Sequence, residues 1–193
     1  GFRHLVRTTR PGGIVMVSLY SKYSRRLLRA KQQTCKMLGG DDIDKRVEWG
    51  EKLFSGTLRK LDKRYHGLNT KQIAYDIFGF PHESLHSAGE VLRWFDDNAV
   101  DYKGSFAPLR IQDYFYAFSL PEYAVFRSTF SGFPVMRWVA DLMDMVSKRI
   151  IDSESSIVEF PRPGALSRCL SQTMWIPFGL RFNCFTMAGI KRD

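Results

Sequence analysis

The sequence has few cysteines and no long apolar run. Its three cysteines, Cys35, Cys169 and Cys184, are scattered and show no paired spacing. This pattern argues against a disulfide framework or a zinc knot and is typical of reduced, mostly buried thiols in a cytosolic protein. No run of about eighteen apolar residues occurs, which excludes a membrane-spanning helix. We therefore expect a cytoplasmic protein without a membrane partner.

Acidic residues are scarce relative to basic ones. The chain has 20 Asp and Glu against 29 Lys and Arg, a net charge of +9. Such a charge suggests nucleic acid, but the basic residues are spread along the whole chain, so we do not expect a nucleic-acid partner. The densest group is Lys22, Arg25, Arg26, Arg29, Lys31 and Lys36. A solvated helix face is the main interpretation of this group, and a contact with an anion or acidic substrate is the alternative.

The order of patterns along the 193 residues predicts a single α/β fold with helical insertions. Residues 1–9 resemble the last turns of a helix. The apolar run 14–20 is typical of a strand covered on both faces. Ser87 and Glu90 form a capping box that begins a helix. The other predicted elements are helices over 22–38, 44–61, 70–78 and 165–175, a helix from Pro134, and strands over 100–106 and 181–190.

Polar and aromatic residues follow the first predicted strand. Tyr20, Tyr23 and Arg25 come at or after its carboxyl end, where ligands bind in open α/β sheets. We predict that they line a substrate pocket. The alternative is an aromatic packing cluster with Arg25 exposed.

The segment from His82 to His86 matches the pattern H-E-x-x-H. In zinc proteases the two His lie one turn apart on a continuous helix, with the Glu as base. Here Ser87 begins the next helix, so both His are expected in a loop, and we predict no metal site. Two interpretations remain: His82 and His86 stabilise that loop, or they act on a substrate as acid and base, with Glu83 binding the substrate.

Three segments resemble the carboxyl-terminal half of class I S-adenosylmethionine-dependent methyltransferases, especially a bacterial subgroup. The first, Arg10–Arg25, is similar to the family's Pro-Gly-Gly turn and fifth strand. The second comprises 81–87 and 90–95, similar to the segment before the sixth strand. The third, 185–191, is similar to the last strand. Together they cover about a third of the chain.

The resemblance implies the last three strands of a partial Rossmann-like sheet, with the final strand antiparallel between the other two. Residues 1–193 would then be the carboxyl-terminal part of one methyltransferase domain, with insertions at about 22–86 and 107–180. No G-x-G-x-G loop occurs in the sequence, so the implied cofactor-binding half lies outside this chain, and we assign no cofactor-binding residue here.

The implied function is methyl transfer from S-adenosylmethionine to a small-molecule acceptor, with His82 and His86 as catalytic residues and Tyr20, Tyr23, Arg25 and Glu83 binding the acceptor. This fragment alone is expected to be inactive. Two alternatives stay open. One is a zinc-dependent hydrolase that uses His82, Glu83 and His86. The other is a non-catalytic basic binding module.

Overall fold

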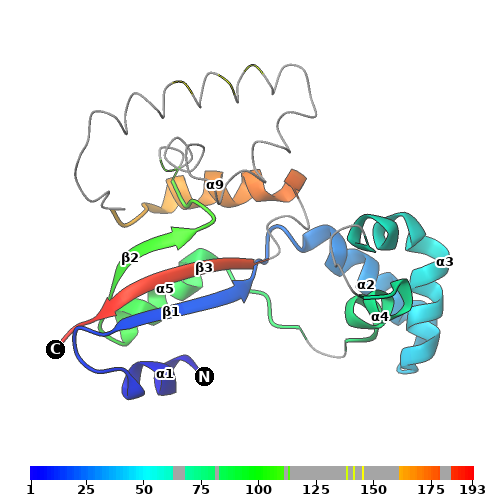
Figure 1. The fold of residues 1–193 in the computed structure, drawn as a ribbon, viewed down its shortest axis with the longest axis horizontal. Helices are drawn as coiled ribbons and strands as arrows, with labels where there is room; N and C mark the ends of the chain where they lie inside the picture. The colour runs from blue at the N-terminus through cyan, green and yellow to red at the C-terminus, as the bar shows by residue number, and fades with distance from the viewer. Residues whose placement is uncertain are drawn as a thin grey trace. The chain divides into compact units, whose positions relative to one another are not determined.

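The structure is a computed structural model that describes residues 1–62, 68–80, 83–110, 113, 138, 141, 145, 161–178 and 184–193. Two compact units divide the chain (Figure 1). Unit 1 comprises Gly1–Leu19, His86–Trp175 and Cys184–Asp193, and unit 2 comprises Tyr20–Leu85 and Ile176–Asn183. The helix predicted from Pro134 lies almost entirely outside the described residues. His82 also lies outside them.

Unit 1 is built on a three-stranded sheet of β1 (Ile14–Tyr20), β2 (Val100–Phe106) and β3 (Cys184–Lys191), in the order β1-β3-β2. β2 and β3 are antiparallel, with Val100 opposite Lys191. The Gly12 N–H donates to the Lys191 carbonyl at 2.9 Å and the Lys191 N–H to the Gly13 carbonyl at 3.0 Å, so the end of β3 meets the start of β1. The predicted order and the antiparallel last strand are therefore confirmed (Figure 1).

The Pro-Gly-Gly turn before β1 requires both of its glycines. Gly12 has a φ of +70°, a conformation that side chains disfavour. A Cβ on Gly13 would lie 2.6 Å from Thr9 Cγ2 and 2.7 Å from the Arg10 carbonyl oxygen. The turn joins α1 (Phe2–Thr8), the expected helix end, to the sheet.

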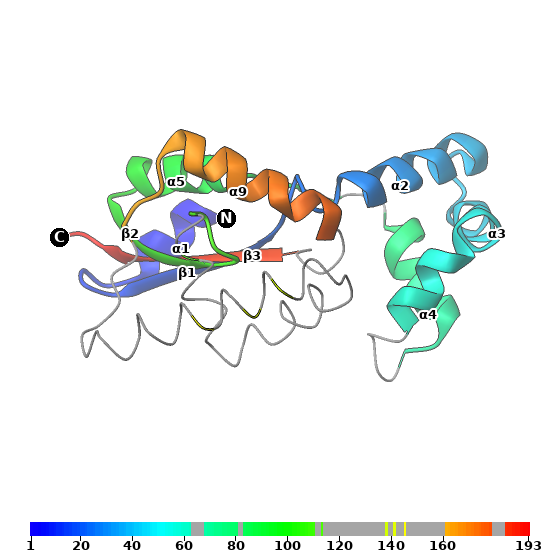
Figure 2. The same ribbon diagram turned by 90° about the horizontal axis from the view of Figure 1, so that it is seen from above.

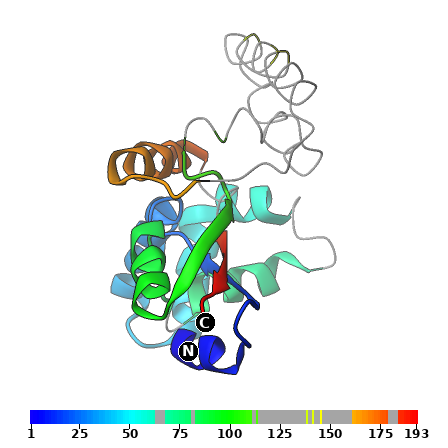
Figure 3. The ribbon, with the colours of Figure 1, turned by 90° about the vertical axis from the view of Figure 1, so that its left-hand side faces the viewer.

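Helices α5 (Ala88–Asp97) and α9 (Ala165–Phe178) lie on the same side of the sheet (Figures 2 and 3). Phe2 from α1 stacks on Phe95 from α5, with ring centroids 5.6 Å apart. Trp175 from α9 meets Phe185 from β3 at 5.8 Å. The predicted capping box is present, because Ser87 accepts from the Glu90 N–H while the Glu90 carboxylate accepts from the Ser87 N–H. Both predicted helices, 165–175 and the one after Ser87, are thus confirmed.

The prediction that both faces of β1 are covered was wrong. Val15 is fully buried, but Ile14 and Met16 are 74% and 64% exposed. Successive side chains of a strand point to opposite faces, so one face of β1 is buried and the other is accessible. The apolar run indicates that both faces of the strand are hydrophobic. It does not indicate which segments of the chain cover each face.

In the described part of the chain, the elements that lie wholly within unit 2 are helices. α2 (Arg26–Gly39) packs against α3 (Ile43–Asp62), and α4 (Thr70–Ala74) continues into the π-helical turn η1 (Tyr75–Gly79) (Figures 1 and 2). Gly50 allows the Phe78 ring to lie directly on the α3 backbone. The unit-2 core contains these buried residues: Leu28, Cys35, Val47, Leu58, Leu61, Ile73, Ala74, Ile77 and Phe78.

The helices predicted over 44–61 and 70–78 are confirmed, whereas α2 starts four residues later than predicted. Within α2, Leu28 and Cys35 are buried, whereas Leu27 and Leu38 are 62% and 49% exposed. None of the helices in the described ranges combines the length and the apolarity of a membrane span.

Candidate functional site

A serine-anchored turn connects β1 to α2. The hydroxyl of the buried Ser21 accepts hydrogen bonds from the backbone N–H groups of Tyr23 and Ser24, each at 3.3 Å. The Arg25 N–H donates to the Ser21 carbonyl at 3.2 Å. Serine favours such turns because its hydroxyl satisfies nearby backbone donors. The turn therefore fixes the backbone positions from which the side chains of Tyr23 and Arg25 project.

Arg25 and Glu83 form a buried ion pair in unit 2. Arg25 Nη2 lies 2.5 Å from Glu83 Oε1, and the two side chains are 5% and 8% exposed. The Arg25 guanidinium also lies over the Tyr20 ring, 4.1 Å from its centroid. The pair thus cancels the charge of Arg25, and the aromatic face of Tyr20 covers its guanidinium.

This ion pair is incompletely hydrogen-bonded. Among the buried side-chain nitrogen and oxygen atoms of the described residues, Arg25 Nε and Glu83 Oε2 are the two that lack a hydrogen-bond partner. Buried polar groups are normally satisfied, so the pair is held together chiefly by the single short contact and by charge. Removing either partner would leave an uncompensated buried charge.

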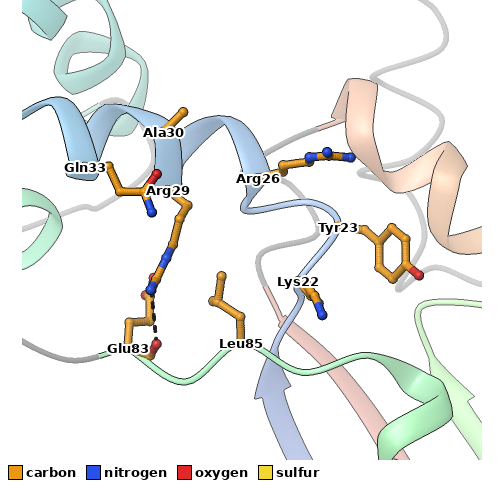
Figure 4. Close-up of a pocket in the computed structure, with 8 residues that line it drawn as sticks. All are labelled: Lys22, Tyr23, Arg26, Arg29, Ala30, Gln33, Glu83 and Leu85. Atoms are coloured by element: carbon orange, nitrogen blue, oxygen red, sulfur yellow. Dashed lines mark hydrogen bonds between the residues drawn. The ribbon is translucent and has the colours of Figure 1, made fainter.

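A pocket of about 670 Å³ opens beside this pair within unit 2 (Figure 4). Arg29 extends from α2 toward Glu83, and its Nη1 donates to the Glu83 carbonyl oxygen at 3.3 Å. Arg26 and Tyr23 extend on the other side of Leu85 in this view. The pocket is lined by Lys22, Tyr23, Arg26, Arg29, Ala30, Gln33, Glu83 and Leu85.

The charges in the pocket do not balance. Lys22, Arg26 and Arg29 are exposed cations that line it, whereas Glu83, the one carboxylate among its described lining residues, is already paired with Arg25. The first turn of α2 carries no acidic residue, and its N-cap makes no side-chain hydrogen bond. The positive end of the helix dipole therefore adds to the local positive charge. The pocket is suited to an anionic ligand.

A smaller hollow of about 270 Å³ lies on the same face of α2. It shares Arg29, Gln33 and Glu83 with the larger pocket and adds Lys36 from the next turn of the helix. The positive surface thus continues along α2, but the larger pocket has the room for a metabolite-sized molecule.

His86 belongs to unit 1 and is held next to the start of α5. Its Nδ1 lies 3.5 Å from Glu90 Oε2, and its ring packs edge-on against Trp94 with centroids 4.9 Å apart. Glu90 also completes the capping box with Ser87. These contacts give His86 a structural role at the helix start and leave an acid/base role untested.

Within the described ranges, no group of three or more His, Cys, Asp or Glu side chains could hold a metal ion. His82 lies outside those ranges. The H-E-x-x-H segment is not part of a helix over 83–87, whereas the zinc-protease pattern needs both His on one continuous helix.

The structure brings together four of the predicted site residues. Arg25 contacts both Tyr20 and Glu83, and Tyr23 lines the pocket together with Glu83. Arg25 is buried, which excludes the alternative of an exposed Arg25 beside an aromatic cluster. Arg25 thus supports the pocket wall through Glu83 and does not line the pocket.

The three cations that line the pocket belong to the basic group that the sequence favoured as a solvated helix face, with a contact to an anion as the alternative. A signal was present: Arg26, Arg29, Ala30 and Gln33 recur at spacings of three and four residues, which places them on one side of a helix. The neighbouring wall, Glu83 to Leu85, comes from over fifty residues away in the chain. Nothing local in the sequence indicates that contact.

No family model matches this sequence, and no curated protein is significantly similar to it.

Proposed function

We propose that the chain is the acceptor-binding part of an S-adenosylmethionine-dependent methyltransferase that modifies a small molecule. The observation that carries the proposal is the strand order β1-β3-β2, with the last strand antiparallel between two earlier ones. The resemblance to class I methyltransferases implies that order for the final three strands of a Rossmann-like sheet. The glycines required by the turn before β1 also fit the Pro-Gly-Gly segment that carries the resemblance.

Two features of the residues that the structure describes do not fit the cofactor itself. A glycine-rich loop between a strand and a helix would allow close approach of the cofactor, but the Pro-Gly-Gly turn comes before β1 and joins it to α1. The carboxylate of Glu83 is buried against Arg25 and is not free to bind ribose hydroxyls. In this proposal the methyl donor is therefore bound by residues outside this sequence.

The role of this chain is then to bind and orient the acceptor. Methyl displacement depends mainly on positioning, with a base where the nucleophile loses a proton. The pocket beside Tyr23 and Glu83 binds the acceptor, and Arg25 fixes Glu83 in place. His82 and His86 are the candidate bases, since an imidazole can accept a proton from a hydroxyl or phenol.

The test uses a longer protein that contains these residues together with an upstream glycine-rich segment. We expect that protein to bind S-adenosylmethionine in titration calorimetry, and the 193-residue chain to bind it far more weakly. With tritiated methyl donor and a low-molecular-mass extract, label should enter small molecules. Failure of the longer protein to bind the donor would refute the proposal.

The His residues are tested in the same assay. His82→Ala or His86→Ala should lower the rate about a hundredfold if that residue is the base. His4→Ala, a change at an exposed position of α1, is the matched control and should leave the rate unchanged. Wild-type rates in both variants would leave the pair a structural role. Stoichiometric zinc that is lost in both variants would instead favour a hydrolase.

A further inference from the structure

The pocket in unit 2 has an excess of positive charge that a neutral acceptor would leave uncompensated. Lys22, Arg26 and Arg29 contribute three cations, and Arg25 cancels the lining carboxylate. A single carboxylate on a ligand would balance only one of these charges. A phosphate monoester carries close to two negative charges at neutral pH and three acceptor oxygens, so it matches this set of donors better.

The geometry points to a specific ligand class: we propose that this pocket binds a small phosphate monoester whose organic part is apolar or aromatic. The hydrogen bond from Arg29 to the Glu83 carbonyl uses one of the five N–H donors of the guanidinium. That bond orients Arg29 in the pocket and leaves donors for a phosphate. Arginine suits this role because its planar fork binds two phosphate oxygens at once.

The remaining lining residues fit an organic group. Tyr23, Ala30 and Leu85 supply aromatic and aliphatic surface, and Gln33 supplies an amide. The volume of about 670 Å³ exceeds what a phosphate ion needs and is within the range of small-molecule pockets. The ligand is therefore a phosphorylated metabolite and not inorganic phosphate alone.

That the phosphate monoester is the methyl acceptor rests on the proposed function. That the pocket binds a phosphate monoester does not. The experiment therefore measures binding to the 193-residue chain without any methyl donor. Phenyl phosphate is the probe, benzoate and benzyl alcohol are the singly charged and neutral comparisons, and titration calorimetry is done at low salt. We expect phenyl phosphate to bind at least tenfold more tightly than benzoate, with no detectable binding of benzyl alcohol.

Arg26→Gln and Arg29→Gln should each weaken phenyl phosphate binding about tenfold, because each removes a charge-assisted hydrogen-bond donor. Arg59→Gln is the matched control: it removes the same charge from an exposed position of α3 in the same unit, outside the pocket lining, and should change the affinity less than twofold. Far-ultraviolet circular dichroism establishes that each variant is folded. If a pocket variant does not fold, a competition measurement on the wild-type chain takes its place. Inorganic phosphate should then displace phenyl phosphate from the pocket.

Three results would overturn the inference. The first is equal affinity for phenyl phosphate and benzyl alcohol, or no binding of either. The second is equal weakening by Arg59→Gln and the pocket variants, which would show a response to net charge alone. The third is tight, strongly salt-dependent binding of a single-stranded oligonucleotide that phenyl phosphate does not displace, which would identify a polyanion surface. Methyl transfer that fails while phenyl phosphate still binds would contradict the proposed function and leave the phosphate site intact.

Discussion

Replacing Glu83 by Gln should destabilise unit 2 much more than an ordinary loss of an ion pair. The substitution keeps the shape of the side chain and removes its charge. Arg25, only 5% exposed on its side chain, would then retain a buried charge with no carboxylate beside it. The amide could still accept a hydrogen bond, so the effect measured is chiefly that of the missing charge.

The magnitude follows from burial. Breaking a buried ion pair by removing one partner costs about 3–5 kcal/mol. The lower end is expected here, because Arg25 Nε and Glu83 Oε2 already lack hydrogen-bond partners in the native pair. A loss of about 3 kcal/mol would lower the urea midpoint by about 1–3 M for a denaturant slope of about 1–3 kcal/mol per molar.

The assay is urea unfolding followed by circular dichroism at 222 nm, which reports the helices of the chain, α2 and α3 of unit 2 among them. Glu48→Gln is the matched control, since the Glu48–Lys52 pair has a similar separation of 2.6 Å but both side chains are 59% exposed. Its removal should cost at most about 0.5 kcal/mol. The double variant Arg25→Met, Glu83→Leu should recover most of the loss, because it buries no charge. Equal midpoints for Glu83→Gln and Glu48→Gln would refute the reasoning.

Three further predictions concern other sites. Gly189→Ala should lower the free energy of unfolding in urea by about 1–3 kcal/mol, because the added Cβ would lie 2.6 Å from the Asp101 carbonyl oxygen. Gly56→Ala in α3 should instead raise it by about 0.5–1 kcal/mol, because open space surrounds the position of the added Cβ. Burial raises the pKa of Cys35, so a thiol titration at pH 7.5 should modify the two exposed cysteines quickly and Cys35 slowly; three equally fast thiols would contradict this. The hydrogen bonds from Arg162 lower the pKa of Asp96, so its contribution is present above the unfolded pKa of about 3.9 and is lost as pH falls through the lower folded value. Asp96→Asn should therefore cost at most about 1 kcal/mol at pH 7, and progressively less as the pH falls below about 3.9.

Local patterns predicted most of the elements of this fold. The capping box at Ser87 and Glu90 fixed the start of α5 to the residue, because both of its hydrogen bonds are local in sequence. The start of α2 was placed too early, because the sequence cannot show that Ser21 anchors a turn with its own hydroxyl before the helix begins. The exposure of Ile14 and Met16 was missed for a different reason: coverage of a strand face depends on distant segments.

The candidate site was predictable only in part. Tyr23 and Glu83 were identified from their positions after a strand and before a capped helix, and both line the pocket. The pairing of Arg25 with Glu83 joins residues 58 positions apart, so no local pattern could reveal it. Without that contact, Arg25 and Arg29 look equivalent in the sequence, although one is buried and neutralised and the other is exposed in the pocket.

This difference explains why net charge alone says little about function here. The densest basic group in the chain divides into three physical roles. Arg25 is compensated by a buried carboxylate. Lys31 donates to the Thr57 hydroxyl at 2.5 Å, and burial lowers its pKa. Arg26 and Arg29 remain available to a ligand. A solvated helix face would leave all of these residues interchangeable, so single Gln substitutions along the group should give distinct results: loss of stability at Arg25, and loss of phosphate binding with normal stability at Arg26 and Arg29.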